Sequence, residues 1–340
     1  MRIAINGFGR IGRVFLRLAI EQGLEVVAIN DLGSPESLVH LFKYDSVHGG
    51  FKGTLSFRDG ALHVSGRAIR IFSEAEPGRL PWAALQVDVV VEATGRNLTR
   101  AKATAHLDAG ARKVLISAPA ADRDIPMVVL GVNDSTADLD APVLSNASCT
   151  TNNVAAMIKI LDDTWGITEG YITTVHSMTG DQNLHDAHHK DLRRARAASA
   201  SIIPTTTGAA KAITQVFPHL DGRLGGAGIR VPVLNGSLTD FTCILVKPAT
   251  VVEINEAFRA AAAGPLKGIL EYTEDPIVSV DILDNPHSCI FDAQLTSVVG
   301  DLVKVVGWYD NEYGYSSRLV DVLKKIQDRE AFGTRITDTW

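Results

Sequence analysis

The feature that most constrains the fold of this sequence is a glycine pattern near its N-terminus. Gly7, Gly9 and Gly12 form a GxGxxG motif, directly after the strand-like apolar residues 3–5 and directly before an amphipathic helical pattern. Such glycines allow a tight turn and let the backbone approach a pyrophosphate group at the free N–H groups of a helix N-terminus. A chain that begins in this way is expected to form a Rossmann-type domain.

An acidic residue follows this motif at the spacing of a dinucleotide-binding unit. Asp31 ends the next predicted strand, 19 residues after Gly12. Its carboxylate can accept a hydrogen bond from a ribose hydroxyl and repels a 2′-phosphate, so it favours NAD over NADP. The alternative, a glycine-rich turn without a ligand, is disfavoured because strand, helix and acid occur together.

The first half of the chain alternates between short apolar runs and helical patterns. Branched apolar residues recur at 26–29, 89–91, 114–116 and 127–130, and a helical face over residues 11–19 ends at Gly23. Apolar runs of this kind are typical of buried parallel strands. We therefore predict an α/β domain with a doubly wound sheet.

The pattern changes from Thr150 onward. A helix is predicted over residues 152–165, and alternating runs follow at 171–175, 237–246, 278–282 and 303–308. Alternation indicates half-buried, antiparallel strands, so the second domain is predicted to be α+β with a mostly antiparallel sheet. The predicted domains are residues 1–148, joined by a C-terminal helix at about 313–340, and residues 149–312.

Composition excludes several classes of protein. The chain has 33 Lys and Arg against 39 Asp and Glu, a net charge of −6, which disfavours nucleic acid and anionic membranes as partners. Its three cysteines, an odd number at wide spacing, suit a reducing compartment. No leader or membrane-spanning run is recognisable, so we expect a cytoplasmic protein without membrane or nucleic-acid partners.

A reactive pair is predicted in the second domain. Cys149 lies where a strand pattern changes to a helix, and a helix N-terminus stabilises a thiolate. His176 ends the following predicted strand and could act on that thiol as base and then as acid. From these residues alone, an inert buried cysteine and a core histidine remain open alternatives.

At this point the sequence resembles a known family. The residues that carry the resemblance are 5–13, 145–152, 174–176, 205–212 and 308–314. In order and spacing, from Arg2 to about Ile326, the chain closely resembles phosphorylating glyceraldehyde-3-phosphate dehydrogenases. The resemblance implies that Cys149 forms a hemithioacetal with D-glyceraldehyde 3-phosphate, that NAD takes the hydride, and that phosphate releases 1,3-bisphosphoglycerate.

The same resemblance implies roles for further residues and a homotetramer. The expected NAD contacts are Gly7, Gly9, Arg10, Ile11, Gly12, Asp31, Ser117 and Asn311. The expected substrate-phosphate ligands are Thr179 and Arg230, and those of inorganic phosphate are Ser148, Thr150, Arg196, Thr207 and Gly208. Two alternatives stay open: an erythrose-4-phosphate dehydrogenase, or a non-catalytic NAD-binding regulatory protein on the same fold.

Three features stand apart from this pattern. His185, His188 and His189 form a cluster, but without a usual ligand set they predict no metal site. His188 stands where many NAD-specific relatives have proline, which slightly weakens the prediction of NAD alone. Asn153 replaces the family's second cysteine one helical turn after Cys149, so it is either a neutral change or a device for tolerance of thiol-directed inhibitors.

Overall fold

The structure, a computed structural model, describes residues 1–337 and divides into two compact units. The first unit comprises Met1–Val128, Thr136–Ala147 and the chain from Ser316 onward. The second unit comprises Val129–Ser135 and Ser148–Tyr315. Residues 338–340 of the predicted C-terminal helix lie outside the described residues.

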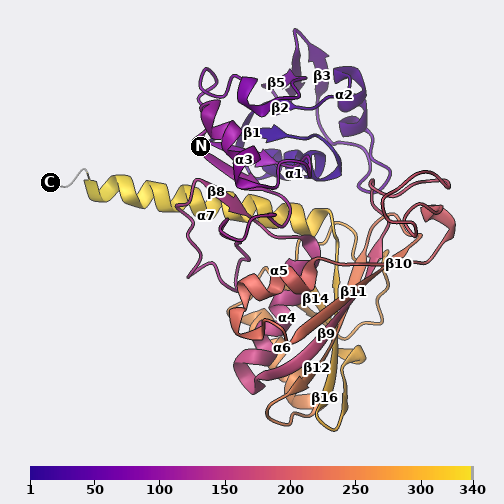
Figure 1. Cartoon of the computed structure of the whole chain (residues 1–340). Coiled ribbons are helices and arrows are strands. Elements are labelled where there is room, and N and C mark those ends of the chain that lie inside the picture. The colour runs from indigo at the N-terminus through magenta and orange to yellow at the C-terminus, as the bar shows by residue number, and fades with distance from the viewer. Residues whose placement is uncertain (338–340) are drawn as a thin grey trace. The chain divides into compact units, whose positions relative to one another are not determined.

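The first unit is built on an eight-stranded sheet (Figure 1). Its strands are β1 (Arg2–Asn6), β2 (Glu25–Asn30), β3 (Leu55–Arg58), β4 (Ala61–Val64), β5 (Arg67–Phe72), β6 (Val89–Glu92), β7 (Lys113–Ile116) and β8 (Val143–Ser145). They lie in the order β3-β4-β5-β2-β1-β6-β7-β8. All neighbours from β5 to β8 are parallel, which confirms the predicted doubly wound sheet. The antiparallel extension β3-β4-β5 was not predicted.

Helices follow the strands of this unit. They are α1 (Arg10–Glu21), α2 (Pro35–Lys43), α3 (Arg100–Asp108) and, from the C-terminal end of the chain, α7 (Tyr313–Thr337), with a short 3-10 helix η1 (Pro77–Arg79). The predicted apolar face of α1 is buried, and the chain leaves the helix at Gly23 with φ of 75°. Ile3, Ala4 and Ile5 of β1 are fully buried, as expected of a parallel strand covered on both faces.

One predicted strand of the first half is wrong. Met127 forms only an isolated bridge to Ser145, and the chain then turns, with the Val129 N–H donating to Asn133 Oδ1 at 2.8 Å. The edge position of the sheet is taken by β8 instead. The apolar run at 127–130 indicated burial correctly, but burial alone does not distinguish a strand from a buried turn.

The second unit contains a mixed sheet. Its strands are β9 (Ile167–Ser177), β10 (Ile203–Thr205), β11 (Leu224–Val231), β12 (Ser237–Leu245), β13 (Leu270–Thr273), β14 (Cys289–Asp292), β15 (Ser297–Val299) and β16 (Leu302–Tyr309). The order is β10-β11-β9-β12-β16-β14-β13, with β15 also pairing with β16. Only β9–β11 and β13–β14 are parallel among these pairs, so the prediction of a mostly antiparallel sheet is confirmed.

A long buried helix packs against this sheet. The helices of the unit are α4 (Cys149–Trp165), α5 (Ala209–Val216) and α6 (Val251–Ala263), with the 3-10 helices η2 (Ala198–Ala200), η3 (Pro218–Leu220) and η4 (Ala293–Leu295). Val154, Met157 and Leu161 of α4 are fully buried, and α4 lies against β12 and β16. Burial alternates residue by residue along β12, which is the pattern of a strand with one covered face.

The predicted strand at 278–282 is also wrong. This segment forms turns, in which the Val278 N–H donates to the Asp281 carboxylate at 2.7 Å. Val278 and Val280 are 54% and 67% exposed. Because Asp281 satisfies the backbone locally, the alternating apolar residues are not drawn into the sheet.

Candidate active site

Cys149 is the first residue of α4, and its position depends on the two residues before it. Ala147 is buried and has a left-handed φ of 54°, which turns the chain sharply before the helix. Ser148 is the N-cap, and its Oγ accepts a hydrogen bond from the Thr151 N–H at 3.1 Å. The thiol therefore lies in the first turn, where the helix dipole favours negative charge.

His176 lies near the end of β9 and meets the thiol. The Cys149 Sγ and His176 Nε2 atoms are 3.6 Å apart, which is within hydrogen-bond range for sulfur. His176 Nδ1 is 2.8 Å from the Ser177 carbonyl oxygen, an atom that can only accept. Arg230 Nη1, which can only donate, lies 3.0 Å from the same nitrogen. A proton on Nδ1 satisfies the shorter contact to the Ser177 carbonyl, and in that tautomer Nε2 is unprotonated and able to take the proton of the thiol.

The surroundings of this pair favour the uncharged form of both side chains. Burial raises the pKa of the Cys149 thiol, although Arg230 and hydrogen bonds from Thr150 act in the opposite direction. Burial and the nearby charge of Arg230 lower the pKa of His176 to about 3. An uncharged thiol beside an uncharged imidazole is an arrangement in which a proton can pass from Sγ to Nε2.

Arg230 is brought to His176 by the register of two parallel strands. In the pairing of β9 with β11, Arg230 stands opposite His176. Its Nη1 atom donates to the Ser177 carbonyl at 3.0 Å and to Thr179 Oγ1 at 2.9 Å. The predicted phosphate ligands Thr179 and Arg230 therefore lie together, next to His176.

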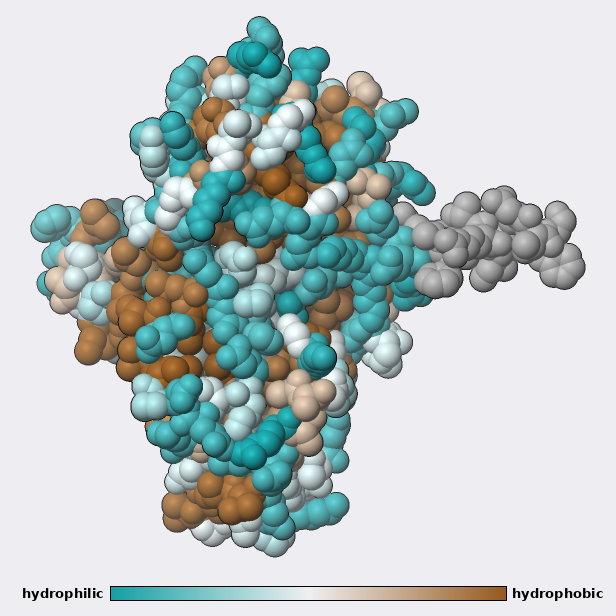
Figure 2. All heavy atoms as spheres, turned by 180° about the vertical axis from the view of Figure 1, so that it is seen from behind, coloured by the Kyte–Doolittle hydropathy of each residue, from teal (hydrophilic) through white to brown (hydrophobic). Residues whose placement is uncertain are grey.

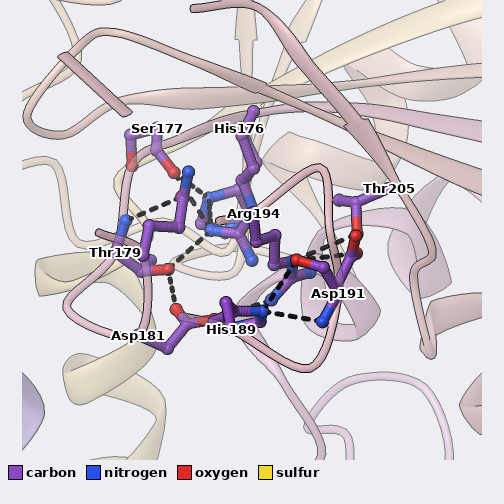
Figure 3. Close-up of polar contacts among 10 residues, drawn as sticks. His176, Ser177, Thr179, Asp181, His189, Asp191, Arg194 and Thr205 are labelled. Atoms are coloured by element: carbon purple, nitrogen blue, oxygen red, sulfur yellow. Dashed lines mark hydrogen bonds and ion pairs between the residues drawn. The ribbon is translucent and has the colours of Figure 1, made fainter. Parts of the chain in front are cut away.

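A second arginine, which the sequence analysis missed, joins this cluster. Figure 3 shows Arg194 between Asp181 and Thr205, and its Nη1 pairs with Asp181 Oδ2 at 2.6 Å. Arg194 Nε donates to Thr205 Oγ1 at 3.0 Å. Asp181 in turn accepts a hydrogen bond from the Thr179 hydroxyl.

Arg196, the arginine expected here, is placed elsewhere. It pairs with Asp186 at 3.0 Å, and both side chains are largely exposed. Sequence spacing could not indicate which arginine of residues 193–196 joins the cluster, because the chain around them is irregular rather than a helix or strand.

The remaining expected phosphate ligands lie at two helix starts. Ser148 and Thr150 begin α4, where the Thr150 hydroxyl contacts the Tyr309 hydroxyl at 2.9 Å. Thr207 and Gly208 precede α5, and Gly208 is an N-cap without a side-chain hydrogen bond. Both places offer hydroxyl or N–H groups of the kind that bind anions.

Asn311 lies just after the last strand of the sheet and has a fixed partner set. Its Oδ1 accepts hydrogen bonds from Ser177 Oγ at 2.9 Å and from Ser237 Oγ at 2.8 Å. Asn311 is 5% exposed. With its oxygen occupied by two hydroxyls, the amide has its NH₂ group available for donation.

The glycine motif of the first unit forms a backbone cradle. A Cβ atom on Gly7, whose φ is 95°, would lie 2.6 Å from the Thr94 nitrogen, and one on Gly12 would lie 2.2 Å from the Gly7 carbonyl oxygen. Around Gly9 the space is open. Gly7 and Gly12 therefore exclude any side chain, while Gly9 faces free volume at the start of α1.

A cavity of about 280 Å³ opens beside this cradle. Asp31 lines it together with Gly7, Gly9, Asn6, Asn30, Leu32, Glu74, Ala75, Ala93, Thr94, Arg96 and Asn97. The Asp31 carboxylate is held by the Phe8 N–H at 2.7 Å and the Gly33 N–H at 2.8 Å. A cradle without side chains, an uncapped helix start and a fixed carboxylate fit a dinucleotide.

Three other expected NAD contacts lie in the same unit. Arg10 and Ile11 open α1. Arg10 holds Asp45 with both guanidinium NH groups, at 2.5 and 3.1 Å. Burial would raise the pKa of Asp45, but the hydrogen bonds from Arg10 and from the backbone of His48 and Val47 lower it far below its usual range. Ser117 follows β7, and its N–H donates to the Glu92 carbonyl.

The departures noted in the sequence have defined surroundings. His189 contacts the backbone of Asp191 through Nδ1 (Figure 3). Asn153 is fully buried in α4 and donates to the Trp308 carbonyl at 3.2 Å. It therefore replaces a thiol with an amide that links α4 to β16.

Comparison with known proteins assigns both halves of the chain. A family model described as the NAD binding domain of glyceraldehyde 3-phosphate dehydrogenase matches residues 1–100, and one described as the C-terminal domain matches residues 148–311. Glyceraldehyde-3-phosphate dehydrogenase 1 of Streptomyces avermitilis is 52% identical, covering 96% of this chain and 99% of the relative. The glyceraldehyde-3-phosphate dehydrogenase of Mycobacterium avium is 55% identical, covering 95% and 97%.

Proposed function

The chain belongs to the glyceraldehyde-3-phosphate dehydrogenase family, and from this premise we propose which of its residues carry the reaction. It is an NAD-dependent enzyme that converts D-glyceraldehyde 3-phosphate and phosphate to 1,3-bisphosphoglycerate. Neither erythrose 4-phosphate as the main substrate nor a purely regulatory role is favoured by the relatives. The roles of individual residues follow from the geometry of the second unit.

Cys149 is the nucleophile and His176 the base in this proposal. As Sγ attacks the aldehyde carbon, its proton passes to His176 Nε2 and from there to the carbonyl oxygen, which gives a hemithioacetal. When the hydride leaves that carbon, the same nitrogen takes the hydroxyl proton and a thioester remains. Attack of phosphate on the thioester breaks the S–C bond and restores Cys149.

Bound NAD supplies the acceptor for the hydride. We assign its pyrophosphate to the cradle of Gly7, Gly9 and Gly12 with Arg10 and Ile11, and its adenosine ribose to Asp31. Ser117 and Asn311 are assigned to further cofactor contacts, with Asn311 donating its NH₂ group to the nicotinamide carboxamide. The cofactor-binding domain would be residues 1–148 together with the C-terminal helix.

The two phosphate groups are assigned to two sets of donors. Thr179 and Arg230 would bind the phosphate of the substrate, because both lie beside His176. Ser148, Thr150, Thr207 and Gly208 would bind the attacking phosphate. In place of Arg196, we assign the guanidinium of that second site to Arg194, whose side chain is 18% exposed and contacts Asp181 and Thr205, whereas that of Arg196 is 67% exposed and pairs with Asp186.

The contact between Cys149 Sγ and His176 Nε2 carries this assignment. The test is a steady-state assay of NADH formation with glyceraldehyde 3-phosphate or erythrose 4-phosphate, each with and without phosphate. We expect the highest kcat/KM with the triose and a requirement for phosphate. Preference for the tetrose would overturn the substrate, and phosphate-independent turnover would overturn the thioester step.

We also propose that the enzyme is a cytoplasmic homotetramer. No helix of the described residues has the length and apolar character needed to cross a bilayer. Large apolar side chains of the second unit are exposed, notably Leu184, Leu192, Ile202, Val278 and Val280, and Figure 2 shows hydrophobic side chains gathered in patches on the face it presents. Such patches are typical of subunit interfaces. Light scattering after size-exclusion chromatography would give four times the chain mass.

A further inference from the structure

A buried carboxylate supports the proposed cofactor cavity of the first unit. Glu92 ends β6 and is 1% exposed. Its oxygens accept hydrogen bonds from Asn6 Nδ2 at 2.6 Å, from Asn97 Nδ2 at 3.0 Å and from the Thr94 N–H at 2.8 Å, and also from the Thr94 hydroxyl. Asn6, Thr94 and Asn97 all line the cavity. One carboxylate therefore binds three residues that line the cavity.

The donors around Glu92 keep it ionised. Burial would raise the pKa of Glu92, but hydrogen bonds from His106, Thr94, Asn97 and Asn6 lower it below the usual range. An ionised carboxylate only accepts hydrogen bonds, so every neighbour must present a donor. The charge of Glu92 thus dictates how the surrounding amides are turned.

Behind the carboxylate, a tryptophan fixes the tautomer of a buried histidine. Trp82 Nε1 lies 3.0 Å from His106 Nδ1, and both side chains are fully buried. Because an indole N–H can only donate, His106 Nδ1 must be unprotonated. Nε2 then carries the proton and donates it to Glu92 Oε2 at 3.1 Å.

On the cavity side, the order of donors and acceptors continues through two amides. Since Asn6 gives its NH₂ group to Glu92, its Oδ1 faces outward and accepts from Asn30 Nδ2 at 2.7 Å. Asn30 Oδ1 then accepts from the Glu74 N–H at 2.9 Å. Asn30 and Glu74 also line the cavity, so each step of the chain from Trp82 to Glu74 determines the next.

We propose that Glu92, held by His106 and Trp82, is a positioning residue for the dinucleotide. It sets the polarity of the wall formed by Asn6, Asn30 and Asn97. The inference rests on the proposed assignment of this cavity to NAD, and it concerns the adenosine-ribose part of the ligand, because Asp31 lines the same cavity. Neither the GxGxxG motif nor Asp31 predicts these residues.

The main test is Glu92→Gln. A glutamine has the same shape, but its NH₂ group faces neighbours that are all donors, and at least one buried donor loses its acceptor. We expect the Kd values of NAD and of ADP-ribose, measured by calorimetry, to rise by the same factor, about tenfold or more. A rise for NAD without one for ADP-ribose would place the effect outside the adenosine half and overturn the proposal.

Lys113→Met is the matched control. Lys113 is also buried in this unit, and its Nζ donates to the carbonyls of Leu139 and Ala141, which do not line the cavity. We expect this variant to lose thermal stability while its Kd for NAD stays at the wild-type value. If both variants weaken NAD binding to the same degree at equal loss of stability, Glu92 acts only through stability and the proposal fails.

Trp82→Phe is a milder variant that retains the packed ring. The wild type should show His106 as the Nε2–H tautomer in long-range ¹H–¹⁵N spectra. The variant frees Nδ1, and we expect a second tautomer together with a smaller rise in the Kd of ADP-ribose. An Nδ1–H tautomer in the wild type, or an unchanged Kd in the variant, would contradict the inference. Failure of the wild type to bind NAD at all would instead refute the proposed cofactor site.

Discussion

Two buried histidines, one in each unit, differ in how their ring nitrogens are used. His106 carries its proton on Nε2, because the Trp82 N–H can only donate to Nδ1, and both ring nitrogens have fixed partners in Trp82 and Glu92. His176 Nδ1 lies 2.8 Å from the Ser177 carbonyl oxygen and 3.0 Å from Arg230 Nη1, while its Nε2 faces the thiol of Cys149 at 3.6 Å. A histidine whose two ring nitrogens both have fixed partners can hold the lining of a cavity in place, whereas a histidine with one available nitrogen can transfer a proton.

The largest effect is expected at the thiol itself. Cys149→Ser should abolish oxidation of the aldehyde, because a serine hydroxyl is a far weaker nucleophile beside the same imidazole. NAD binding should remain near wild type, since the expected contacts with the cofactor do not include Sγ. Steady-state kinetics and calorimetry measure the two properties separately. Appreciable turnover by this variant would refute the nucleophile assignment.

Removal of the available nitrogen should be the next largest change. For His176→Asn we expect a fall in kcat of about 10² to 10⁴, the range of a lost general base. Alkylation of Cys149 by iodoacetamide near neutral pH should also slow, because no base accepts the thiol proton. Equal alkylation rates in variant and wild type would show that the pair does not interact.

The next prediction concerns the first unit, where Asp31 is expected to set the choice between NAD and NADP. Asp31→Ala should narrow the preference for NAD over NADP by roughly tenfold to hundredfold, since it removes a charged acceptor and the repulsion of a 2′-phosphate. Asp31→Asn is the control, because it removes the charge but keeps one acceptor oxygen, whereas in Asp31 one oxygen accepts from the Phe8 N–H and the other from the Gly33 N–H. If the wild type already uses both cofactors equally, Asp31 does not set selectivity.

Acid should lower the stability of the protein through His176. The pKa of His176 is lowered to about 3 in the native state, so between pH 6.5 and 3 the unfolded chain binds a proton that the native chain does not. From pH 7.5 to 5 the free energy of unfolding of the wild type should therefore fall by about 2 kcal/mol more than that of His176→Asn. Urea unfolding at both pH values measures this, and parallel pH dependences would contradict it.

The smallest effect is expected at Asn153. Because its amide links α4 to β16 one helical turn after Cys149, we expect Asn153→Cys to loosen this packing and to be inactivated a few-fold faster by a bulky thiol-directed reagent. Peroxide, a small oxidant, serves as the comparison, since it reports the redox chemistry of Cys149 rather than the room around it. Equal rates for both proteins with both agents would make Asn153 a neutral change.

Local patterns predicted the elements around both sites well. The strand of residues 3–5, the helix that follows and the strands at 171–175, 237–246 and 303–308 were identified because period and burial agree there, whereas β10, β11, β13, β14 and β15 were not predicted. Residues 127–130 and 278–282 were wrong because apolar residues also occur in buried turns and on exposed surface. The antiparallel strands β3 and β4 were not predicted at all, since they contain short, partly exposed runs such as Leu55–Arg58.

The two candidate sites depend on which residues meet in space, and a sequence pattern does not show this. Cys149 and His176 each lie at the end of an element, so their types and positions indicated chemistry. Arg194 and Asp181 lie in irregular chain, where no period indicates which side chains meet. Glu92 is an acid at the end of an apolar strand, a position that indicates burial, but no period indicates that Thr94 and Asn97 of the following loop, His106 of α3 and Asn6 of β1 all turn their donors toward it.

The pairing of Arg230 with His176 also affects the chain during folding. Since side chains alternate along a strand, a slip of one residue between β9 and β11 would turn Arg230 to the opposite face of the sheet. Joining strands in parallel across a long connection is a slow and late event. In a newly made chain, Cys149 is therefore an ordinary thiol until β9 and β11 have paired in the correct register. The rate at which its reactivity appears can therefore be used to measure the rate of correct folding.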